Sequence, residues 1–579
     1  MRKLLKYLKN YKKELILGPF FKLLEAIFEL IVPIVMAKII DKGIANNDSG
    51  YIIKMSIVII LLGICGLGFA LTCQYLASKC AYGFGTELRE ALYKHINSLS
   101  YESIDKIGTS SLVNRLTNDS NTVQNGVNMF IRLAVRAPFL IIGAAVMAVT
   151  IDAKLSMVFF IAAPLISAVI FFIMKKTIPM YKATQKKLDR ASVITQENLE
   201  GARVIRAFSR QQDEINEFNK AVNDITESSV AVGKLSAILN PIAFMVMNLG
   251  IVAVLWFGGV RIDSGYLSQG ELTAFTNYMT QILLALVVLA NLIIIFTKAI
   301  ASANRISDVF ELIPEAKNME NQISSKNPSE YAVEFKNVSF AYNNSADNSI
   351  SGIDFKLKKG ETLGIIGGTG SGKTTLANLI PCFYRANSGT VNVFGVDVTT
   401  CNTDSLRKRI GVVPQKASLF SGNLRENMQL RKADASDEEI IKALKIAQAW
   451  EFVEKLPDLL DTRISQGGKN LSGGQKQRIS IARALVGDPD ILILDDSSSA
   501  LDYATDLALR QALKENMSGS TVIMISQRAT SLMSADKIIV LEDGIAVGIG
   551  THSELLKSCD VYREIYDSQL NEKENTHND

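Results

Sequence analysis

Cysteine is scarce in this chain and forms no pattern that would bind a metal or make a redox pair. The 579 residues contain six cysteines, which are scattered and show no CxxC pair. A metal or redox centre built on cysteine is therefore not expected, and small buried side chains with a few cytosolic thiols are the simpler interpretation. The six are Cys65, Cys73, Cys80, Cys382, Cys401 and Cys559.

A large excess of charge of one sign is also missing, because the net charge is only +4. The composition gives no indication of a nucleic-acid partner, and none is expected. The basic residues before the first apolar run place the N-terminus in the cytoplasm by the positive-inside rule. A small-residue cleavage site does not follow, and more apolar runs come later, so a cleaved signal peptide is not expected. These residues are Arg2, Lys3, Lys6, Lys9, Lys12 and Lys13.

Long apolar runs are absent from the second half of the chain and fill the first half. The length is too great for one compact domain, and hydrophobic residues make up 48% of the sequence. Crossing a bilayer takes about 20 apolar residues. Six runs qualify, which predicts a multi-pass protein of the plasma membrane, in contact with the lipid bilayer. The runs cover roughly 14–40, 52–79, 129–151, 154–175, 240–262 and 273–297.

Glycine and proline are sparse in the two long connections near 81–128 and 175–234. Their charged, helix-favouring composition predicts membrane helices that continue beyond the bilayer as cytoplasmic rods. Each pair of rods needs a reversal, and we place the reversals at 101–116 and 208–218. The remaining loops are short. Since six is an even number of spans, the chain returns to the cytoplasm after the last of them.

The composition divides the chain into four parts. We expect a membrane domain over 1–313, with six spans and two long cytoplasmic helical loops. A polar, nonperiodic linker over 314–330 leads to a soluble α/β domain over 331–569. The charged tail, 570–579, is expected to be disordered.

Carboxylates in the first apolar run are candidates for a substrate path. Glu25 and Glu29 lie one helical turn apart, with Lys22 close by. Buried carboxylates in a membrane are costly and often mark such a path, and this pair weakly favours amphipathic cations. The alternative is a Lys22–Glu25 pair near the cytoplasmic interface. The last run carries a polar stripe that either lines a pathway or hydrogen-bonds between helices: Asn277, Gln281 and Asn291.

A glycine-rich turn between a buried strand and a helix is the clearest motif in the chain. The strand over 361–367 enters the turn, and a helix follows over 375–380. Glycines let backbone N–H groups wrap a β-phosphate, and the helix N-terminus adds a favourable dipole. Lys373 is expected to reach the β- and γ-phosphates of ATP, and the Thr374 hydroxyl to ligate Mg²⁺. The expected nucleotide contacts are Gly367, Gly368, Thr369, Gly370, Ser371, Gly372, Lys373, Thr374 and Thr375.

A second motif completes a nucleoside-triphosphatase site. Four apolar residues over 491–494 predict a central strand, and Asp495 emerges at its end. This carboxylate would hold Mg²⁺ directly or through water. Two such motifs in this order predict an α/β fold that binds ATP with Mg²⁺.

The sequence further resembles the ATP-binding cassette (ABC) transporters, and specifically their exporter class. The segment Leu471, Ser472, Gly473, Gly474 and Gln475 matches the signature motif, between the phosphate loop and the Asp495 strand. Tyr342 matches the aromatic residue that stacks on adenine. Gln415 matches the glutamine that links Mg²⁺ to the membrane domain. The segment 499–502, ending at Asp502, matches the loop at the dimer interface.

This resemblance covers nearly the whole chain and implies its architecture. An all-α six-helix transmembrane domain of the type 1 exporter would precede an α/β ABC ATPase domain. In the family, the signature closes on the γ-phosphate of ATP held by the other subunit, so a second half-transporter is required. A small-molecule substrate and outward transport are implied by the same resemblance.

Two residues depart from the family at the centre of catalysis. Where the family has a glutamate that polarises the attacking water, this chain has Asp496, whose side chain is shorter by about 1.5 Å. A misplacement of about 1 Å can cost on the order of 100-fold in rate. Where the family has the switch histidine, this chain has Gln527, which cannot carry a positive charge. Gln466 also stands where such exporters often have glutamate.

These departures leave every binding motif intact, which resembles the degenerate-site subunit of heterodimeric bacterial multidrug exporters. In that interpretation the site that contains Asp496 and Gln527 holds ATP but hydrolyses it poorly, and the signature serves the competent site of the partner. The three histidines, His95, His552 and His577, all lie outside the switch position. A homodimeric exporter with slow hydrolysis, or an ATP-gated channel or sensor, remain alternatives.

Overall fold

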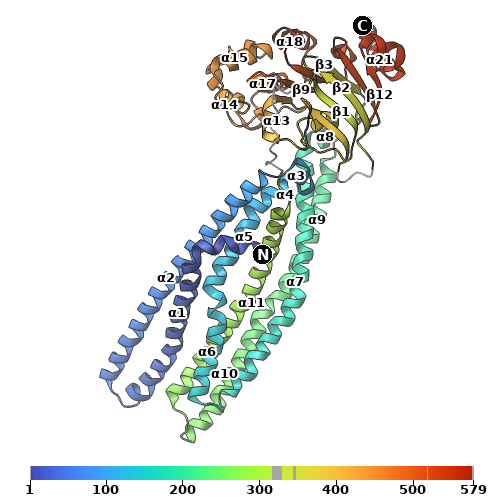
Figure 1. Ribbon diagram of the computed structural model, residues 1–579. Helices are drawn as coiled ribbons and strands as arrows, with labels where there is room; N and C mark the ends of the chain where they lie inside the picture. The colour runs from blue at the N-terminus through green and yellow to red at the C-terminus, as the bar shows by residue number, and fades with distance from the viewer. Residues whose placement is uncertain (1, 316–328, 343–346, 518, 577–579) are drawn as a thin grey trace. The chain divides into compact units, whose positions relative to one another are not determined.

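The computed structural model describes residues 2–315, 329–342, 347–517 and 519–576, which form two compact units (Figure 1). The first, the helical unit, comprises Met1–Asn97 and Ser110–Glu311. The second, the α/β unit, comprises Ser98–Thr109 and Leu312–Asp579. The short stretch Ser98–Thr109 was expected in the membrane domain, but it packs with the α/β unit.

Five stretches of the described residues are long and apolar enough to cross a membrane. The first helix, α1 (Lys12–Lys38), is not among them and carries three charged residues in its middle, although it packs along α2, α6 and α11. The stretches are Ser49–Ile96, Thr109–Ile151, Met157–Glu200, Gln211–Asp263 and Gln269–Glu311. The other helices of the unit are η1 (Arg2–Tyr11), η2 (Ile39–Ile44), α2 (Ser49–Ile96), α4 (Thr109–Asn114), η3 (Arg115–Asp119), α5 (Ser120–Met129), η4 (Phe130–Ala134), α6 (Arg136–Ile151), α7 (Met157–Glu200), α8 (Ala202–Ala207), α9 (Gln211–Ala237), α10 (Leu239–Asp263) and α11 (Gln269–Glu311).

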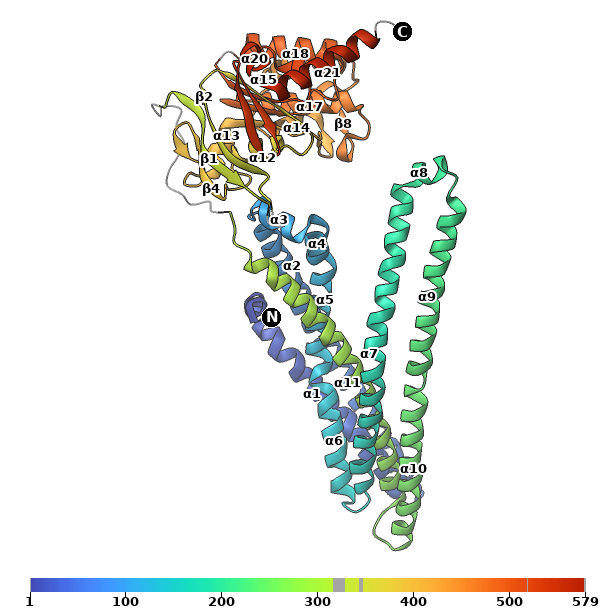
Figure 2. The ribbon, with the colours of Figure 1, turned by 90° about the vertical axis from the view of Figure 1, so that its right-hand side faces the viewer.

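The expected rods are present as continuations of the membrane helices. At 1.5 Å per residue, α2 and α7 are about 72 and 66 Å long, roughly twice the thickness of the hydrocarbon core. In Figure 2, α7 and α9 run side by side and are joined by α8.

The first reversal falls where the sequence places it, and the second does not. Helix α3 (Tyr101–Ile107), Gly108 and α4 occupy the first reversal. The second lies between Glu200 and Gln211, so the expected range 208–218 is wrong for most of its length. Asp213 and Glu214 lie in the first turn of α9. Negative charge there stabilises a helix N-terminus, so this acidic pair marks a helix start, not a turn.

The α/β unit contains a six-stranded sheet whose order is β12-β11-β3-β10-β9-β6. All neighbouring pairs in this sheet are parallel, except the antiparallel pair β11–β12. The strands are β3 (Thr362–Gly367), β6 (Ile410–Val413), β9 (Ile491–Asp495), β10 (Thr521–Ile525), β11 (Lys537–Glu542) and β12 (Ile545–Gly550). β9 is buried along its whole length, as its apolar run predicts.

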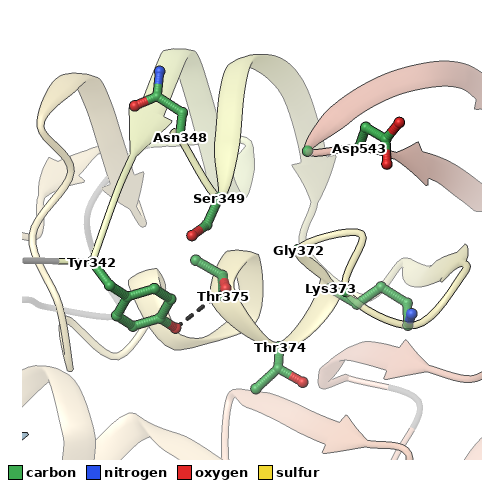
Figure 3. A pocket seen from close by; sticks show the side chains of 10 residues that line it. Tyr342, Asn348, Ser349, Gly372, Lys373, Thr374, Thr375 and Asp543 are labelled. Atoms are coloured by element: carbon green, nitrogen blue, oxygen red, sulfur yellow. Dashed lines mark hydrogen bonds between the residues drawn. The ribbon is translucent and has the colours of Figure 1, made fainter. Parts of the chain in front are cut away.

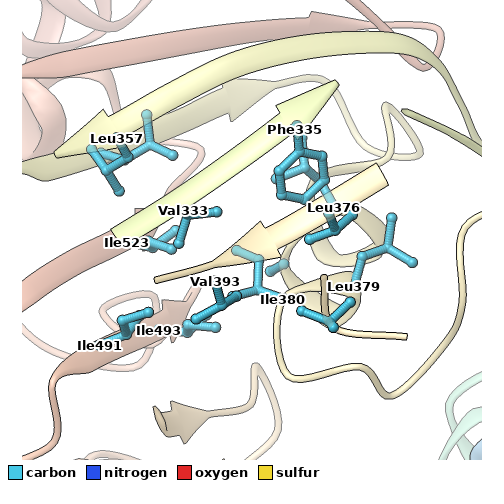
Figure 4. Packing of buried hydrophobic residues seen from close by; sticks show 14 of the residues in the cluster. Val333, Phe335, Leu357, Leu376, Leu379, Ile380, Val393, Ile491, Ile493 and Ile523 are labelled. Atoms are coloured by element: carbon cyan, nitrogen blue, oxygen red, sulfur yellow. The ribbon is translucent and has the colours of Figure 1, made fainter. Parts of the chain in front are cut away.

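A four-stranded sheet of order β2-β1-β4-β5 faces the first sheet across a shared apolar core (Figure 4). Its strands are β1 (Tyr331–Phe340), β2 (Ile350–Lys358), β4 (Ser388–Val393) and β5 (Val396–Asp397). Val333 and Val393 of this sheet pack in one cluster with Ile493 and Ile523 of the larger sheet and with Leu376 of α12 (Lys373–Leu379). This core fixes the glycine-rich turn between two sheets.

The remaining helices of the α/β unit are α13 (Thr403–Arg409), α14 (Leu424–Gln429), α15 (Asp437–Ile446), α16 (Trp450–Val453), η5 (Leu459–Asp461), η6 (Gln466–Gly468), α17 (Gly473–Leu485), α18 (Tyr503–Asn516), α19 (Ala529–Leu532), α20 (His552–Ser558) and α21 (Asp560–Thr576). Helices α14, α15, α16 and α18 pack around α17 in a second core, while α19, α20 and α21 contribute to a third and α13 packs into the first. A short pair, β7 (Gly422–Asn423) and β8 (Arg463–Ile464), lies beside these helices.

The expected linker and tail are described only in part. Residues 316–328 of the linker lie outside the described residues, while Pro314 bridges to Leu99 within the α/β unit. Helix α21 continues to Thr576, so most of the tail that was expected to be disordered is helical. Residues 577–579 lie outside the described residues.

Candidate functional site

The carboxyl ends of three parallel strands meet at one edge of the larger sheet. β10 lies between β3 and β9 and is parallel to both. The phosphate loop, Gly367–Thr374, follows β3, Asp495 ends β9, and Gln527 follows β10. Ligands of open α/β sheets bind at this kind of edge, so the topology brings three separate sequence motifs into one place.

The glycines of the phosphate loop are required by close backbone contacts. A Cβ atom on Gly367 would lie 2.1 Å from the carbonyl oxygen of Leu541. A Cβ on Gly372 would lie 2.6 Å from the carbonyl oxygen of Ser349, and Gly372 also has a left-handed backbone with φ of 95°. Any other residue at these positions would move the loop away from its neighbours.

Lys373, Thr374 and Asp495 form the polar centre of the loop. The Lys373 ammonium donates to the carbonyl oxygens of Gly367 and Gly368, at 2.9 and 2.5 Å. Burial lowers the pKa of Lys373, and a bound phosphate would favour its charged form. Thr374 Oγ1 donates to Asp495 Oδ1 at 3.1 Å, and burial raises the pKa of this carboxyl.

The donor set fits Mg²⁺. A hydroxyl and a carboxylate oxygen, placed side by side next to a phosphate loop, are ligands that Mg²⁺ prefers, with phosphate oxygens and water completing its shell. Among the described residues there is no cluster of three or more His, Cys, Asp or Glu side chains that could hold a metal by itself. A bound Mg²⁺ would supply positive charge against the phosphates at Thr374 and Asp495.

A cavity of about 500 Å³ opens above the phosphate loop (Figure 3). Tyr342 stands at one side of it, and its hydroxyl lies 3.2 Å from Thr375 Oγ1. The Tyr342 ring packs edge-on against Phe340 and Tyr384, which fixes its orientation. The cavity is lined by Tyr342, Asn348, Ser349, Gly370, Gly372, Lys373, Thr374, Thr375, Asp543 and Gly544. Asn348, Ser349, Asp543 and Gly544 had no motif that would have identified them.

The two departures lie next to this centre. Asp496 has a left-handed backbone, with φ of 45°, and its Oδ2 accepts a hydrogen bond from Gln415 Nε2 at 3.3 Å. The side chain of Gln527 is exposed. The side chain of Gln569, from α21, accepts from Ala529 N and donates to Gln527 O. The sequence did not reveal these two hydrogen bonds because Gln569 is about 40 residues away from Gln527 along the chain.

The signature segment forms the N-terminus of α17. Ser472 Oγ accepts from Gln475 N, and the Gln475 side chain accepts from Ser472 N, so the two residues make a reciprocal capping box. Ser472 and Gly473 are exposed, which leaves N–H groups at a helix N-terminus open to an anion. Signature residues are not among those that line the cavity above the phosphate loop. Asp502 caps α18 instead of facing that cavity, and a hydrogen bond from the Thr505 hydroxyl lowers its pKa.

Comparisons with known proteins identify both units. Residues 15–300 match the ABC transporter transmembrane region, and residues 350–499 match the ABC transporter family. YfiB, an ABC transporter ATP-binding protein of Bacillus subtilis, is 38% identical over 98% of this chain and 99% of its own length. This chain belongs to the ABC transporter family. Its α/β unit is the ABC ATPase domain, and its helical unit is the transmembrane domain of a half-transporter.

Other relatives agree with this assignment. The ABC transporter ATP-binding protein MT1311 of Mycobacterium tuberculosis is 33% identical over 97% of each chain. YfiC of Bacillus subtilis is 30% identical over 98% of this chain and 94% of its own length. A bacterial Atm1-family ABC exporter solved with ATP bound has a TM-score of 0.82 at 21% identity, covering 96% of this chain and 98% of that one. The transporter therefore has an Atm1-like exporter fold.

Helix α3 is attached to the ATPase domain by contacts that the sequence did not reveal. Tyr384 Oη donates to Asp105 Oδ2 at 2.6 Å, and the Tyr101 ring lies 4.7 Å from that of Phe383. Burial, and then the Asp105 acceptor, raise the pKa of Tyr384. Because Tyr384 also packs against Tyr342, one aromatic contact joins the nucleotide cavity to α3.

A second group of contacts stabilises the loop that carries these aromatic residues. The Arg407 guanidinium pairs with both carboxylate oxygens of Glu315, at 2.9 and 2.6 Å. It also donates to the carbonyl oxygens of Pro381 and Cys382 and lies over the Phe383 ring. Bidentate pairing gives the contact between Arg407 and Glu315 a fixed geometry. Arg407 therefore stabilises the loop that carries Phe383 and Tyr384.

The Tyr384–Asp105 hydrogen bond should matter for α3 and not for ATP binding. Tyr384→Phe keeps the ring against Tyr342 but removes the hydroxyl. A hydrogen bond of about 1 kcal/mol is lost, so we expect backbone amides of α3 to exchange hydrogen about fivefold faster. Binding of a fluorescent ATP analogue should change by less than about twofold. Tyr566→Phe, in the same domain, is the matched control; unchanged exchange in Tyr384→Phe would contradict the prediction.

The candidate substrate-path residues have different environments. Glu25 pairs with Lys22 at 2.6 Å, which is the simpler of the two alternatives drawn from the sequence. Glu29 pairs with Arg136 of α6 at 2.7 Å, and Gln281 Nε2 lies 3.4 Å from the Glu29 carbonyl oxygen. Asn277 is exposed and donates to Thr273 O of its own helix. Asn291, further along the same helix, is also exposed.

Proposed function

We propose that this chain is the degenerate-site subunit of a heterodimeric ABC exporter of the plasma membrane. It would couple ATP binding and hydrolysis to the outward movement of amphipathic, drug-like molecules, with its N-terminus and ATPase domain in the cytoplasm. The observation that carries the proposal is Asp496, the residue that directly follows β9. Its short carboxylate is hydrogen-bonded to Gln415, and the nearby switch position has Gln527 instead of a cationic histidine.

The arrangement favours ATP retention over hydrolysis in the site of this chain. The phosphate loop, Tyr342 and the Thr374–Asp495 pair keep the geometry that binds MgATP. A general base that cannot reach the attacking water lowers the rate by about 10²–10⁴. The exposed N-terminus of α17 is free of this defect, so it would complete the site on the partner, where hydrolysis takes place.

Transmission to the membrane would follow the helical connections. ATP closes the two ATPase domains in this proposal, and helices that extend beyond the bilayer convey the closure to the membrane. Within this chain, α3 is the best-supported element for that role, because Tyr384 and Phe383 contact it directly. Gln415, which contacts Asp496, would report on the state of the site.

The turnover of the full chain, purified alone in lipid nanodiscs, tests the proposal. We expect slow ATP hydrolysis with normal binding of a fluorescent ATP analogue. The double variant Asp496→Glu/Gln527→His restores the longer base and the cation, so in a pair of its own copies, where each signature completes the other copy's site, turnover should rise at least about tenfold. Rapid hydrolysis by the unaltered chain would contradict the degenerate site and favour a symmetric homodimer.

A further inference from the structure

Three polar side chains from three helices meet inside the transmembrane domain. Glu29 of α1 accepts from Arg136 Nη2 of α6 at 2.7 Å. Gln281 of α11 donates from Nε2 to the backbone oxygen of Glu29 at 3.4 Å. The three helices pack against one another pairwise. A charged pair and an amide therefore lie at a three-helix junction.

This junction lies deep in the membrane segment. Asp41, beyond the non-cytoplasmic end of α1, accepts a hydrogen bond from Gly270 N at the start of α11 and marks that end of both helices. Along the chain, Glu29 is about 18 Å from Asp41, and Gln281 is about 17 Å from Gly270. Arg136 is about 22 Å from Ile151, the end of α6. In a hydrocarbon core of about 30 Å, ionisable groups at this depth usually serve a function.

Two buried polar atoms at the junction lack a hydrogen-bond partner among the described residues. They are Arg136 Nε, a donor, and Gln281 Oε1, an acceptor. Both residues line a cavity of about 110 Å³ together with Glu29, and its other walls are apolar. Buried polar atoms without partners are costly, so a group that satisfied both of them would bind favourably. The apolar walls are Leu133, Ala137, Leu140, Leu284, Ala285 and Val288.

The charges of the junction determine which group fits. Arg136 neutralises Glu29, so neither charged group is clearly favoured. An ammonium group would be attracted by Glu29 and repelled by Arg136, and a carboxylate would be attracted by Arg136 and repelled by Glu29. An uncharged amide carries one acceptor for Arg136 Nε and one donor for Gln281 Oε1. A volume of about 110 Å³ holds roughly as much as three or four water molecules, which is enough for an amide group but not for a whole drug-sized molecule.

We propose that Arg136 and Gln281 bind an uncharged amide group of the transported molecule, whose apolar body extends along the neighbouring helices. This inference rests on the proposed export function of the helical unit, but not on the degenerate ATP site. It replaces the cationic preference that Glu25 and Glu29 suggested, since Lys22 and Arg136 balance these two carboxylates.

The test uses the full chain in lipid nanodiscs and three probes of equal chain length: decanamide, decylammonium and decanoate. Binding is read from the probe concentration that gives half of the maximal shift in thermal unfolding temperature. Decanamide should act at a concentration at least about tenfold lower than either charged probe. Gln281→Met and Arg136→Lys should each raise that concentration about tenfold, which corresponds to about 1.4 kcal/mol. Arg136→Lys keeps the charge that pairs with Glu29 but removes Nε.

Thr280→Val is the matched control, because it removes a polar group from the same helix, α11, at an exposed position outside the cavity. It should keep the response of the unaltered chain to decanamide. Equal or tighter binding of decylammonium would overturn the proposal, as would an unchanged decanamide response in Gln281→Met. A decanamide response that persists in a chain with rapid, symmetric ATP hydrolysis would overturn the degenerate site alone and leave this inference intact.

Discussion

In the proposed heterodimer, Asp496→Ala should change ATP turnover by less than about twofold, while replacement of the catalytic glutamate expected in the partner should abolish it. The reason is the length of the side chain at this position. In the proposed assignment Asp496 is too short to position the attacking water, and its carboxylate is hydrogen-bonded to Gln415. Removing it therefore costs little, whereas removing a functioning general base costs about 10²–10⁴ in rate. The measurement is steady-state phosphate release by the purified complex.

The control for this experiment is nucleotide binding at the site of this chain. Thr374 and Asp495 are untouched in Asp496→Ala, so a fluorescent ATP analogue should still bind with Mg²⁺. Equal losses of turnover from the two changes would mean that the two sites share the work of hydrolysis. In that case the asymmetric assignment would be wrong.

The second large effect is expected at the signature. Ser472→Ala should lower the turnover of the complex by about 100-fold, because a donor aimed at the γ-phosphate is worth roughly that much when removed. The same serine also caps α17, so part of any loss could come from a weakened helix. Capping serines contribute about 1 kcal/mol to stability, which a thermal unfolding measurement detects separately.

Ser436→Ala distinguishes the two roles of the signature serine. Ser436 caps α15 through the same kind of capping box, with Glu439 in place of Gln475. It should lose a similar amount of stability and keep normal turnover. If the two variants lose turnover equally, the effect of Ser472 is structural and the phosphate contact is not needed to explain it.

Much of the ATP site could be predicted from the sequence because its motifs are local. The glycines that need close approach, the lysine and threonine that follow them, and the aspartate at the end of β9 occupy fixed positions relative to a strand or a helix. Ser472 and Gln475 show the same principle, since a capping box involves residues only three positions apart. Asp496 and Gln527 were visible as departures for the same reason: each is defined by its neighbours along the chain.

Local patterns failed where a helix end depends on more than composition. The second reversal was placed too late, although the acidic first turn of α9 indicates its start. The charged tail was expected to be disordered, but α21 continues to Thr576, and Gln569 within it clamps the switch segment. Charge alone does not exclude a helix that packs on a domain.

The sequence by itself determined the family, the nucleotide and the two catalytic departures, because these depend on residues within one loop or strand end. Only the tertiary structure decided the charge of the membrane junction and the attachment of α3. Glu29 and Arg136 are 107 residues apart, and Tyr384 and Asp105 are 279 apart. Such pairs form when helices and loops pack, and no periodicity along the chain specifies which side chains then meet. The carboxylate that suggested a cationic substrate is therefore neutralised by an arginine from another helix.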